Sequence, residues 1–227
     1  MYSLPPPKSL TELEFKPTSI TSLSLKVFFK YLSLKTLTGV SMSVDLERLW
    51  GEVEAKRSEA IDLLCKLIEI EAVNPDFGGS GELDRAEFLE PLLSGLGLRI
   101  ERIDFQDKRA KGGVRPNIVA KLDVGAEKTL WLISHLDTVG PGDLSAWKYD
   151  PFKPVVKGDL VYGRGAEDNC QAIVSSILAV KAIVNLGLKP KLNIGLVLAA
   201  DEEAGSEYGV KRLIKRGFFS RKDLIVV

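Results

Sequence analysis

Apolar residues recur at helical spacing through the charged stretch that begins at Asp45. The recurring positions are Leu46, Leu49, Val53, Ile61, Leu64, Cys65, Leu67 and Ile68. An apolar stripe of this period, set among charged residues, predicts one long amphipathic helix that packs on a core. Polar and glycine-rich residues at 74–81 then break the pattern. A second helix is predicted over 83–96, where glycines end it.

Short apolar runs separated by glycines and polar residues fill most of the remaining chain and predict strands. Two further predicted helices, from about 168 to 186 and from 206 to 216, alternate with them. The predicted strands cover residues 98–105, 117–122, 129–134, 160–162, 192–200 and 223–227. This alternation predicts an α/β fold, a three-layer α/β/α sandwich with a largely parallel or mixed central sheet.

The two ends of the sequence differ from its middle. The last predicted strand, 223–227, has the composition of a buried strand. Because α/β sheets place ligands at the carboxyl ends of their strands, we expect residues 42–227 to be the amino-terminal part of a longer catalytic domain. Residues 1–41 contain three consecutive prolines and are rich in Ser, Thr, Leu and Lys. We interpret them as a disordered extension or a start misread upstream of Met42, with a transit-like or membrane-surface segment as the alternative.

The bulk composition narrows the classes of function. Lys plus Arg and Asp plus Glu both number 31, so the net charge is zero and gives no support for a nucleic-acid partner. No apolar run is long enough to span a membrane. The two cysteines, Cys65 and Cys170, do not make a disulfide framework and favour a reduced, cytoplasmic setting. The single histidine, His135, excludes a three-histidine zinc site, so any metal site must rely on carboxylates or on residues from elsewhere.

A histidine and an aspartate follow the apolar run 129–134. His135 and Asp137 are two positions apart, and in an extended segment such side chains project to the same side. Asp137 can then accept a hydrogen bond from one ring nitrogen while the other nitrogen binds a metal ion, which fixes the tautomer and raises the ligand basicity. The alternative is a solitary histidine capped by a neighbouring acid.

Two acidic clusters occupy comparable positions. Asp168 follows Gly163 and Gly165 and opens the next predicted helix, where a carboxylate is electrostatically favoured. An ordinary N-cap aspartate is the alternative there. The acidic run 201–203 follows the apolar run 192–200, and three adjacent acids at a strand end repel one another unless a cation neutralises them. A solvated acidic turn is the alternative. Carboxylate oxygens and one imidazole together suit zinc, cobalt or manganese.

The order and spacing of these clusters match the signature of one set of metallohydrolases. The clusters are Ser-His-Leu-Asp-Thr-Val, Gly-Arg-Gly-Ala-Glu-Asp-Asn and Ala-Asp-Glu-Glu-Ala-Gly-Ser. From roughly Asp45 to Val227 the sequence resembles the amino-terminal half of the zinc metallopeptidase family of aminoacylase, acetylornithine deacetylase, succinyl-diaminopimelate desuccinylase and carboxypeptidase G. The resemblance implies a zinc-exopeptidase-like fold and an enzyme, a metal-dependent hydrolase that cleaves an amide bond of an N-acyl amino acid or small peptide. Asn169 and Cys170 depart from the lysine-containing version of the second cluster and leave the subfamily open.

Carried over position by position, the resemblance implies a role for five residues. His135 binds one metal ion and Asp137 orients it. Asp168 bridges two metal ions, and Glu203 binds the second. Glu202 is the general base. The implied cofactors are two divalent metals, with zinc as the first choice and cobalt or manganese as alternatives.

Two further features follow from the resemblance. In the family the peptide bond after the bridging aspartate is often cis, which points to Asp168-Asn169. The segment 147–152 resembles one that the family places beside the site. It forms one wall of a substrate pocket, or it is only a loop anchored by its aromatic residues.

The resembling enzymes take further metal ligands, and a separate dimerisation domain, from sequence that is absent here. Within this chain each metal has two protein ligands, fewer than the three of catalytic zinc sites, so weak binding and little activity are expected of it alone. For the complete protein the resemblance implies a small-molecule substrate and allows a homodimer, with no nucleic-acid or membrane partner. Two alternatives stay open: a non-catalytic remnant that keeps the fold with weak metal binding, and a nucleotide-binding α/β protein that uses the loop at Gly163.

Overall fold

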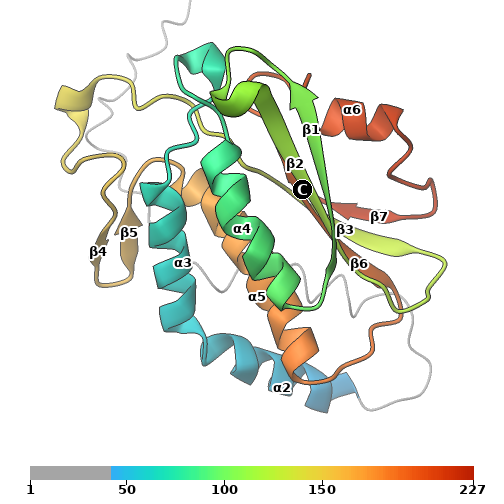
Figure 1. Ribbon diagram of the computed structural model, residues 1–227. Coiled ribbons are helices and arrows are strands. Elements are labelled where there is room, and N and C mark those ends of the chain that lie inside the picture. Colours follow the sequence, from blue (N-terminus) through green and yellow to red (C-terminus); the bar gives the residue numbers. More distant parts are fainter. Residues whose placement is uncertain (1–41) are drawn as a thin grey trace, which may run out of the picture.

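The computed structural model describes residues 42–227, and the interpretation given to residues 1–41 lies outside that range. Figure 1 shows several helices lying along a twisted sheet, with a small hairpin set apart from it. Among the described residues, no helix has both the length and the apolar character needed to cross a membrane.

The amphipathic stripe that follows Asp45 forms two helices, so the prediction of one long helix was wrong. Helix α2 spans Met42–Glu54 and α3 spans Arg57–Glu69, and Lys56 between them has non-helical backbone angles (φ −101°, ψ 18°). The bend allows both helices to pack against α5 (Gln171–Asn185). Periodicity located the buried face but not the bend, because lysine is a good helix former and gives no signal of a break.

The remaining helices agree with the prediction, except that two of them begin later than expected. α4 spans Leu83–Gly95 and α6 spans Val210–Lys215. The predicted starts at Asp168 and Ser206 were several residues too early. Asp168 has extended backbone angles (φ −109°, ψ 97°), and Ser206 has a φ of 62°. Short 3₁₀ turns cover Pro75–Phe77, Lys111–Gly113 and Leu144–Ala146, and a wider turn covers Ala166–Cys170.

The strands of the described range are Arg99–Gln106 (β1), Val114–Leu122 (β2), Thr129–His135 (β3), Val155–Lys157 (β4), Leu160–Tyr162 (β5), Asn193–Ala199 (β6) and Leu224–Val226 (β7). Five of them form one sheet in the order β1-β2-β6-β3-β7, and β4 and β5 form the separate hairpin. β2 is antiparallel to both β1 and β6, whereas β3 is parallel to both β6 and β7. The mixed form of the predicted sheet is thus confirmed.

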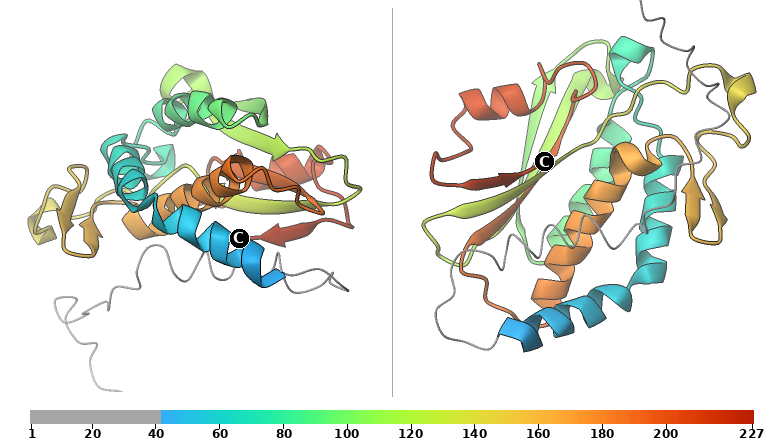
Figure 2. Two further views of the ribbon diagram at one scale, coloured as in Figure 1. Left: turned by 90° about the horizontal axis from the view of Figure 1, so that it is seen from below. Right: turned by 180° about the vertical axis from the view of Figure 1, so that it is seen from behind.

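The sheet lies between two layers of helix. On one face, α2, α3, α4 and α5 contribute to a main core that includes Ile118, Leu132 and Leu196 from the strands. On the other face, Leu213 of α6 packs with a smaller cluster that includes Trp131. Figures 1 and 2 show α6 across the strands from the other helices. The predicted three-layer α/β/α arrangement is therefore present.

Among the described residues, strand β7 lies at an edge of the sheet and is more exposed than its composition predicted. It pairs with β3 through Leu130↔Leu224, and Leu224 and Ile225 are 47% and 51% exposed. A fully apolar run is typical of the centre of a parallel sheet. The position of a strand within the sheet decides its burial, and that position depends on tertiary pairing rather than on the strand's own composition.

Candidate metal centre

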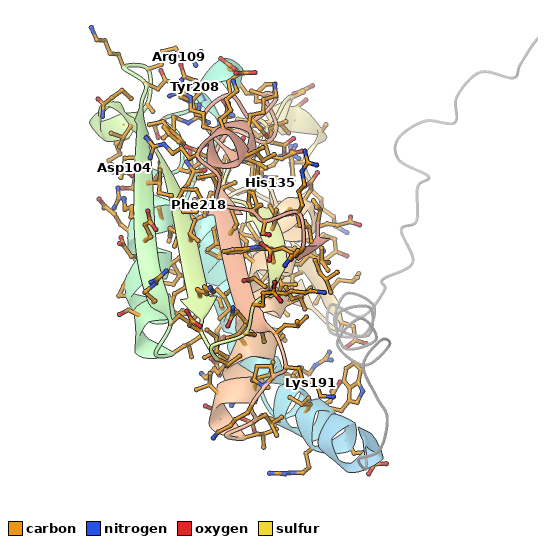
Figure 3. The ribbon with its side chains drawn as sticks, turned by 90° about the vertical axis from the view of Figure 1, so that its right-hand side faces the viewer. Asp104, Arg109, His135, Lys191, Tyr208 and Phe218 are labelled. Carbon is orange, nitrogen blue, oxygen red and sulfur yellow. The ribbon has the colours of Figure 1, made fainter. Side chains whose placement is uncertain are left out.

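The candidate site lies at the carboxyl ends of two neighbouring parallel strands. His135 is the last residue of β3, and it pairs with Ala199, the last residue of β6. Both strands therefore end at the same edge of the sheet, which brings the acidic turn 201–203 next to His135. Figure 3 shows His135 at the opposite end of the sheet from Lys191, which precedes β6.

Three side chains that the sequence suggested as metal ligands meet at this edge. One ligand atom each from His135, Asp168 and Glu203 lies within 4.8 Å of the other two, and the side chains that the structure describes, from residue 47 on, form no other such group of three. His135 is buried, Glu203 is partly exposed and Asp168 is exposed. Ligand atoms around a tetrahedral zinc ion lie about 3.4 Å apart, given metal–ligand bonds of about 2.1 Å. The chemistry and spacing of these donors therefore fit a divalent cation after small side-chain adjustments.

The two ring nitrogens of His135 face different partners. Nδ1 lies 3.0 Å from the main-chain oxygen of Asp137 and 3.5 Å from its Oδ1. Nε2 lies 2.9 Å from Oδ1 of Asp168 and 3.8 Å from Oε2 of Glu202. The expected contact of His135 with Asp137 is present, although the nearer oxygen belongs to the backbone. A partner at Nδ1 orients the ring and directs Nε2 toward the other carboxylates.

The charges of the site shift two pKa values. Burial lowers the pKa of His135, but the carboxylates of Asp137, Asp168 and Glu202 outweigh it and raise the pKa to about 9. Burial raises the pKa of Glu203, and the negative charge of Asp168 raises it further. The rise in the pKa of His135 and the contribution of Asp168 to that of Glu203 both come from neighbouring carboxylates, and a bound divalent cation would offset this negative charge.

Asp137 is fully buried and holds the acidic turn in place. Its Oδ1 accepts a hydrogen bond from the amide of Glu202 at 3.0 Å, and its Oδ2 accepts one from the amide of Glu203 at 3.2 Å. The side-chain amide of Asn74 donates to the same Oδ2 at 2.7 Å. Asp137 therefore contacts both His135 and the turn that carries the two glutamates, whereas the sequence suggested only the contact with the histidine.

A buried polar group behind the acidic turn was not predicted from the sequence. Arg115 is fully buried, forms an ion pair with Glu82, and places Nη2 3.3 Å from Oδ1 of Asp201. Asn74 donates to the same Oδ1 at 3.1 Å. In the sequence Asn74 marks only the end of a helical pattern, and Arg115 precedes the predicted strand 117–122. No periodicity or motif therefore indicated that either residue is buried near the site.

The segment around Asp168 reaches the site through close backbone packing. The Asp168–Asn169 peptide bond is cis, which confirms the expectation from the resemblance. Oδ1 of Asn169 accepts a hydrogen bond from the amide of His135 at 3.3 Å. A Cβ atom on Gly163 would lie 2.5 Å from Cγ2 of Ile68. Packing against α3 thus explains why glycine occurs at position 163, without any bound phosphate.

Aromatic contacts anchor the loop 147–152. Nε1 of Trp147 donates to the main-chain oxygen of Pro141 at 2.7 Å, and the guanidinium of Arg164 lies 5.1 Å from the centroid of the Trp147 ring. Tyr149 packs edge-on against Tyr162 of β5. These contacts support the interpretation as an anchored loop, and a role in a pocket wall stays a prediction.

Comparisons with known proteins identify the family. Residues 131–226 match the sequence profile of peptidase family M20/M25/M40. An uncharacterized metallohydrolase of Methanocaldococcus jannaschii is 46% identical over 177 residues, which are 74% of this chain and 43% of that protein. The chain belongs to this peptidase family.

Other relatives agree with membership of the M20/M25/M40 family. A succinyl-diaminopimelate desuccinylase of Wolbachia is 31% identical over 157 residues, covering 69% of this chain and 37% of that enzyme. The crystal structure of human carnosine dipeptidase 1 matches with a TM-score of 0.67 at 28% identity, over 79% of this chain and 40% of the dipeptidase. The family and the α/β fold that the three motifs implied are confirmed. The chain spans less than half the length of each of these relatives.

Proposed function

We propose that this chain is the metal-binding part of an enzyme that hydrolyses an amide bond of an N-acyl amino acid or small peptide. The convergence of His135, Asp168 and Glu203 beside Glu202 carries the proposal. Family membership supports a metal-dependent hydrolase. The relatives named desuccinylase and dipeptidase support small acylated amino acids and short peptides as the substrate class.

The donor set suits two divalent metal ions, with zinc as the first choice and cobalt or manganese as alternatives. His135 and Asp168 would hold one ion, and Asp168 and Glu203 would hold the other. When bound, such ions lower the pKa of a water molecule and polarise a substrate carbonyl. Catalytic zinc sites usually have three protein ligands, so two for each ion predict weak metal binding by the 227-residue chain.

Glu202 is the proposed general base. Its side chain is 55% exposed, and its Oε2 lies 3.8 Å from Nε2 of His135, next to the proposed ligands. From this position its carboxylate takes a proton from the attacking water and passes it to the leaving amine. Asp137 keeps His135 in one orientation. Its bonds to the amides of Glu202 and Glu203 keep the base and the ligand in a fixed relative position.

Metal titration and a hydrolysis assay on matched variants test this proposal. The metal-free chain should bind Zn²⁺ or Co²⁺ saturably in calorimetry, and Glu203→Gln should weaken that binding at least ~10-fold. Glu202→Gln should bind metal like the wild type, but lose ~100-fold or more of any hydrolysis of N-acyl amino acids and dipeptides. Glu207→Gln is the control, because Glu207 is an exposed acid paired with Lys211.

The results separate the proposed roles. If Glu202→Gln loses metal and Glu203→Gln keeps it, the roles of the two glutamates are exchanged. If the wild-type chain binds neither Zn²⁺ nor Co²⁺, the proposed metal site is refuted. If Glu207→Gln changes either readout, the effects of the other two variants reflect general charge and not specific ligands.

A non-catalytic remnant that keeps the fold is the second candidate. Saturable metal binding without hydrolysis of any member of the substrate panel would support it over the enzyme. Saturable nucleotide binding would support the third alternative, against which the packing of Gly163 on Ile68 already argues.

A further inference from the structure

Asn74 is a fully buried amide that contacts two acids at once. Its Nδ2 donates to Oδ2 of Asp137 at 2.7 Å and to Oδ1 of Asp201 at 3.1 Å. Its Oδ1 accepts a hydrogen bond from the amide of Asp76 at 3.0 Å, which fixes the orientation of the amide group. Both N–H groups of one side chain are therefore used on carboxylates.

The two acids belong to different segments of the proposed metal centre. Asp137 follows His135 after β3, and Asp201 opens the turn that carries Glu203 after β6. Two buried carboxylates repel each other when no donor or cation lies between them. The amide of Asn74 supplies such a donor and links the two strand ends at the place where the proposed ligands meet.

The backbone of Asn74 is held as firmly as its side chain. Its N–H donates to the main-chain oxygen of Thr138 at 3.0 Å, and its own oxygen accepts hydrogen bonds from the amides of Phe77 and Gly79. Val73 also forms an isolated parallel bridge with Thr138. The amide is thus anchored to the loop that follows β3, so it cannot shift to follow a displaced Asp201 without breaking these bonds.

We infer that Asn74 is a positioning residue for the proposed metal centre. By bonding Asp137 and Asp201 together, it sets the separation between the segment of His135 and the turn of Glu203. This inference rests on the proposed function. Asn74 acts through the two acids, and its replacement should therefore weaken metal binding while leaving the proposed ligands in the chain.

Asn193 provides a matched control on the same sheet. It is also buried, its Nδ2 donates to the main-chain oxygen of Ala126 at 2.8 Å, and its Oδ1 accepts hydrogen bonds from the amides of Val124 and Ala126. It pairs with Thr129 at the start of β3, whereas His135 ends that strand. At about 3.3 Å per residue the two ends of β3 are roughly 20 Å apart.

Titration of the 227-residue chain with Co²⁺ tests the inference. Asn74→Ala and the milder Asn74→Ser are compared with the wild type and with Asn193→Ala, at a temperature where circular dichroism shows each protein folded. Asn74→Ala is expected to raise the Kd for Co²⁺ ~10-fold or more and to change the visible absorption of bound Co²⁺, which reports its coordination geometry. Asn193→Ala is expected to lose thermal stability yet to keep the wild-type Kd and spectrum.

Each other outcome counts against the inference in a different way. If both Asn74 variants bind Co²⁺ as the wild type does, Asn74 has no positioning role and the proposed metal site is unaffected. If Asn193→Ala loses as much affinity as Asn74→Ala, the effect follows from lost stability. If Asn74→Ser does not fold, Asn74 serves folding and not positioning. If the wild-type chain binds neither Co²⁺ nor Zn²⁺, the proposed function fails and this inference fails with it.

Discussion

The two ends of strands β3 and β6 satisfy their polar groups in different ways. At their amino ends, Asp223 accepts hydrogen bonds from the amide of Thr129 and from Nε1 of Trp131. At the same end, the described hydrogen bonds of the Asn193 side chain all go to backbone groups of the loop before β3. Asp223 and Asn193 therefore each have their own donors or acceptors.

The carboxyl ends bury three acids, Asp137, Asp201 and Glu82, that share two of their donors. Asp137 and Asp201 both bond to Asn74, and Glu82 and Asp201 both face Arg115. Burial and mutual repulsion are costly for carboxylates unless a cation lies near them. The comparison teaches that an excess of buried acids, and not polarity itself, distinguishes the end that carries the candidate site.

Among the substitutions that test this comparison, replacement of Arg115 should cause the largest loss of unfolding free energy. In Arg115→Met, Glu82 and Asp201 lose the cation that faces them, and removal of one partner from a buried ion pair costs about 3–5 kcal/mol of unfolding free energy. We expect about 3 kcal/mol, because burial raises the pKa of Glu82 and lets it take up a proton in the variant. Urea unfolding followed by circular dichroism measures the loss.

A second substitution tests whether the stability lost in Arg115→Met comes from the unpaired charge of Glu82. Adding Glu82→Gln to Arg115→Met should recover part of the lost free energy, because it removes one uncompensated acid. A loss below about 1 kcal/mol in Arg115→Met would contradict the view that ionised acids crowd this end.

Asp223→Asn tests the opposite end and should have a smaller effect. Burial raises the pKa of Asp223, but hydrogen bonds from Ser220, Thr129 and Trp131 outweigh it and lower the pKa. A carboxyl whose pKa is lower in the folded than in the unfolded chain stabilises the fold above its unfolded pKa. That stability is lost as the pH falls through the folded pKa. The variant should lose about 1 kcal/mol at neutral pH.

The pH dependence makes this prediction specific. Urea unfolding in steps below about pH 4 should show a loss of stability in the wild type, part of which is absent from Asp223→Asn. Co²⁺ affinity at neutral pH should be equal in the two proteins, because Asp223 lies at the end away from His135. A change in Co²⁺ affinity would show that the two ends are coupled and would weaken the comparison.

Arg57→Ala should have the smallest effect on unfolding free energy. It shows how much an exposed ion pair contributes, for comparison with the buried groups at both ends of the sheet. Arg57 of α3 bonds to Asp159 at 2.6 Å, and the two side chains are 48% and 75% exposed. Exposed pairs of this kind contribute about 0–1 kcal/mol, and salt screens them. Urea unfolding at low and high salt should therefore show little difference from the wild type. A loss of about 2 kcal/mol would mean that surface charges matter as much as buried ones in this chain.

The sequence allowed prediction of the part of the site that strand ends determine. His135 and Glu203 stood out because they follow apolar runs, and Asp168 stood out because it follows a glycine-rich turn before a predicted helix. The structure brings the three together, although their roles stay predictions. Asn74 could not be found in this way. It bonds to acids 63 and 127 positions away, and only the tertiary fold brings such segments together. Arg115 escaped notice for the same reason, since its partners come from separate segments.

The fold shows the same division between local and tertiary information. Short apolar runs that alternate with predicted helices indicated the α/β class and most strands, because strands buried on both faces are apolar throughout. The bend at Lys56 and the exposure of β7 depend on how helices and strands are placed against one another. Neither feature changes the spacing of apolar residues, so the sequence pattern could not predict it.

The bonds from Asp137 to two consecutive amides of the acidic turn mean that folding itself shapes the receptor for an ion. Little conformational entropy then remains to be lost when an ion is captured. Calcium takes about six to eight oxygen ligands, whereas zinc accepts an imidazole and needs fewer ligands, so the three proposed side chains suit zinc better than calcium.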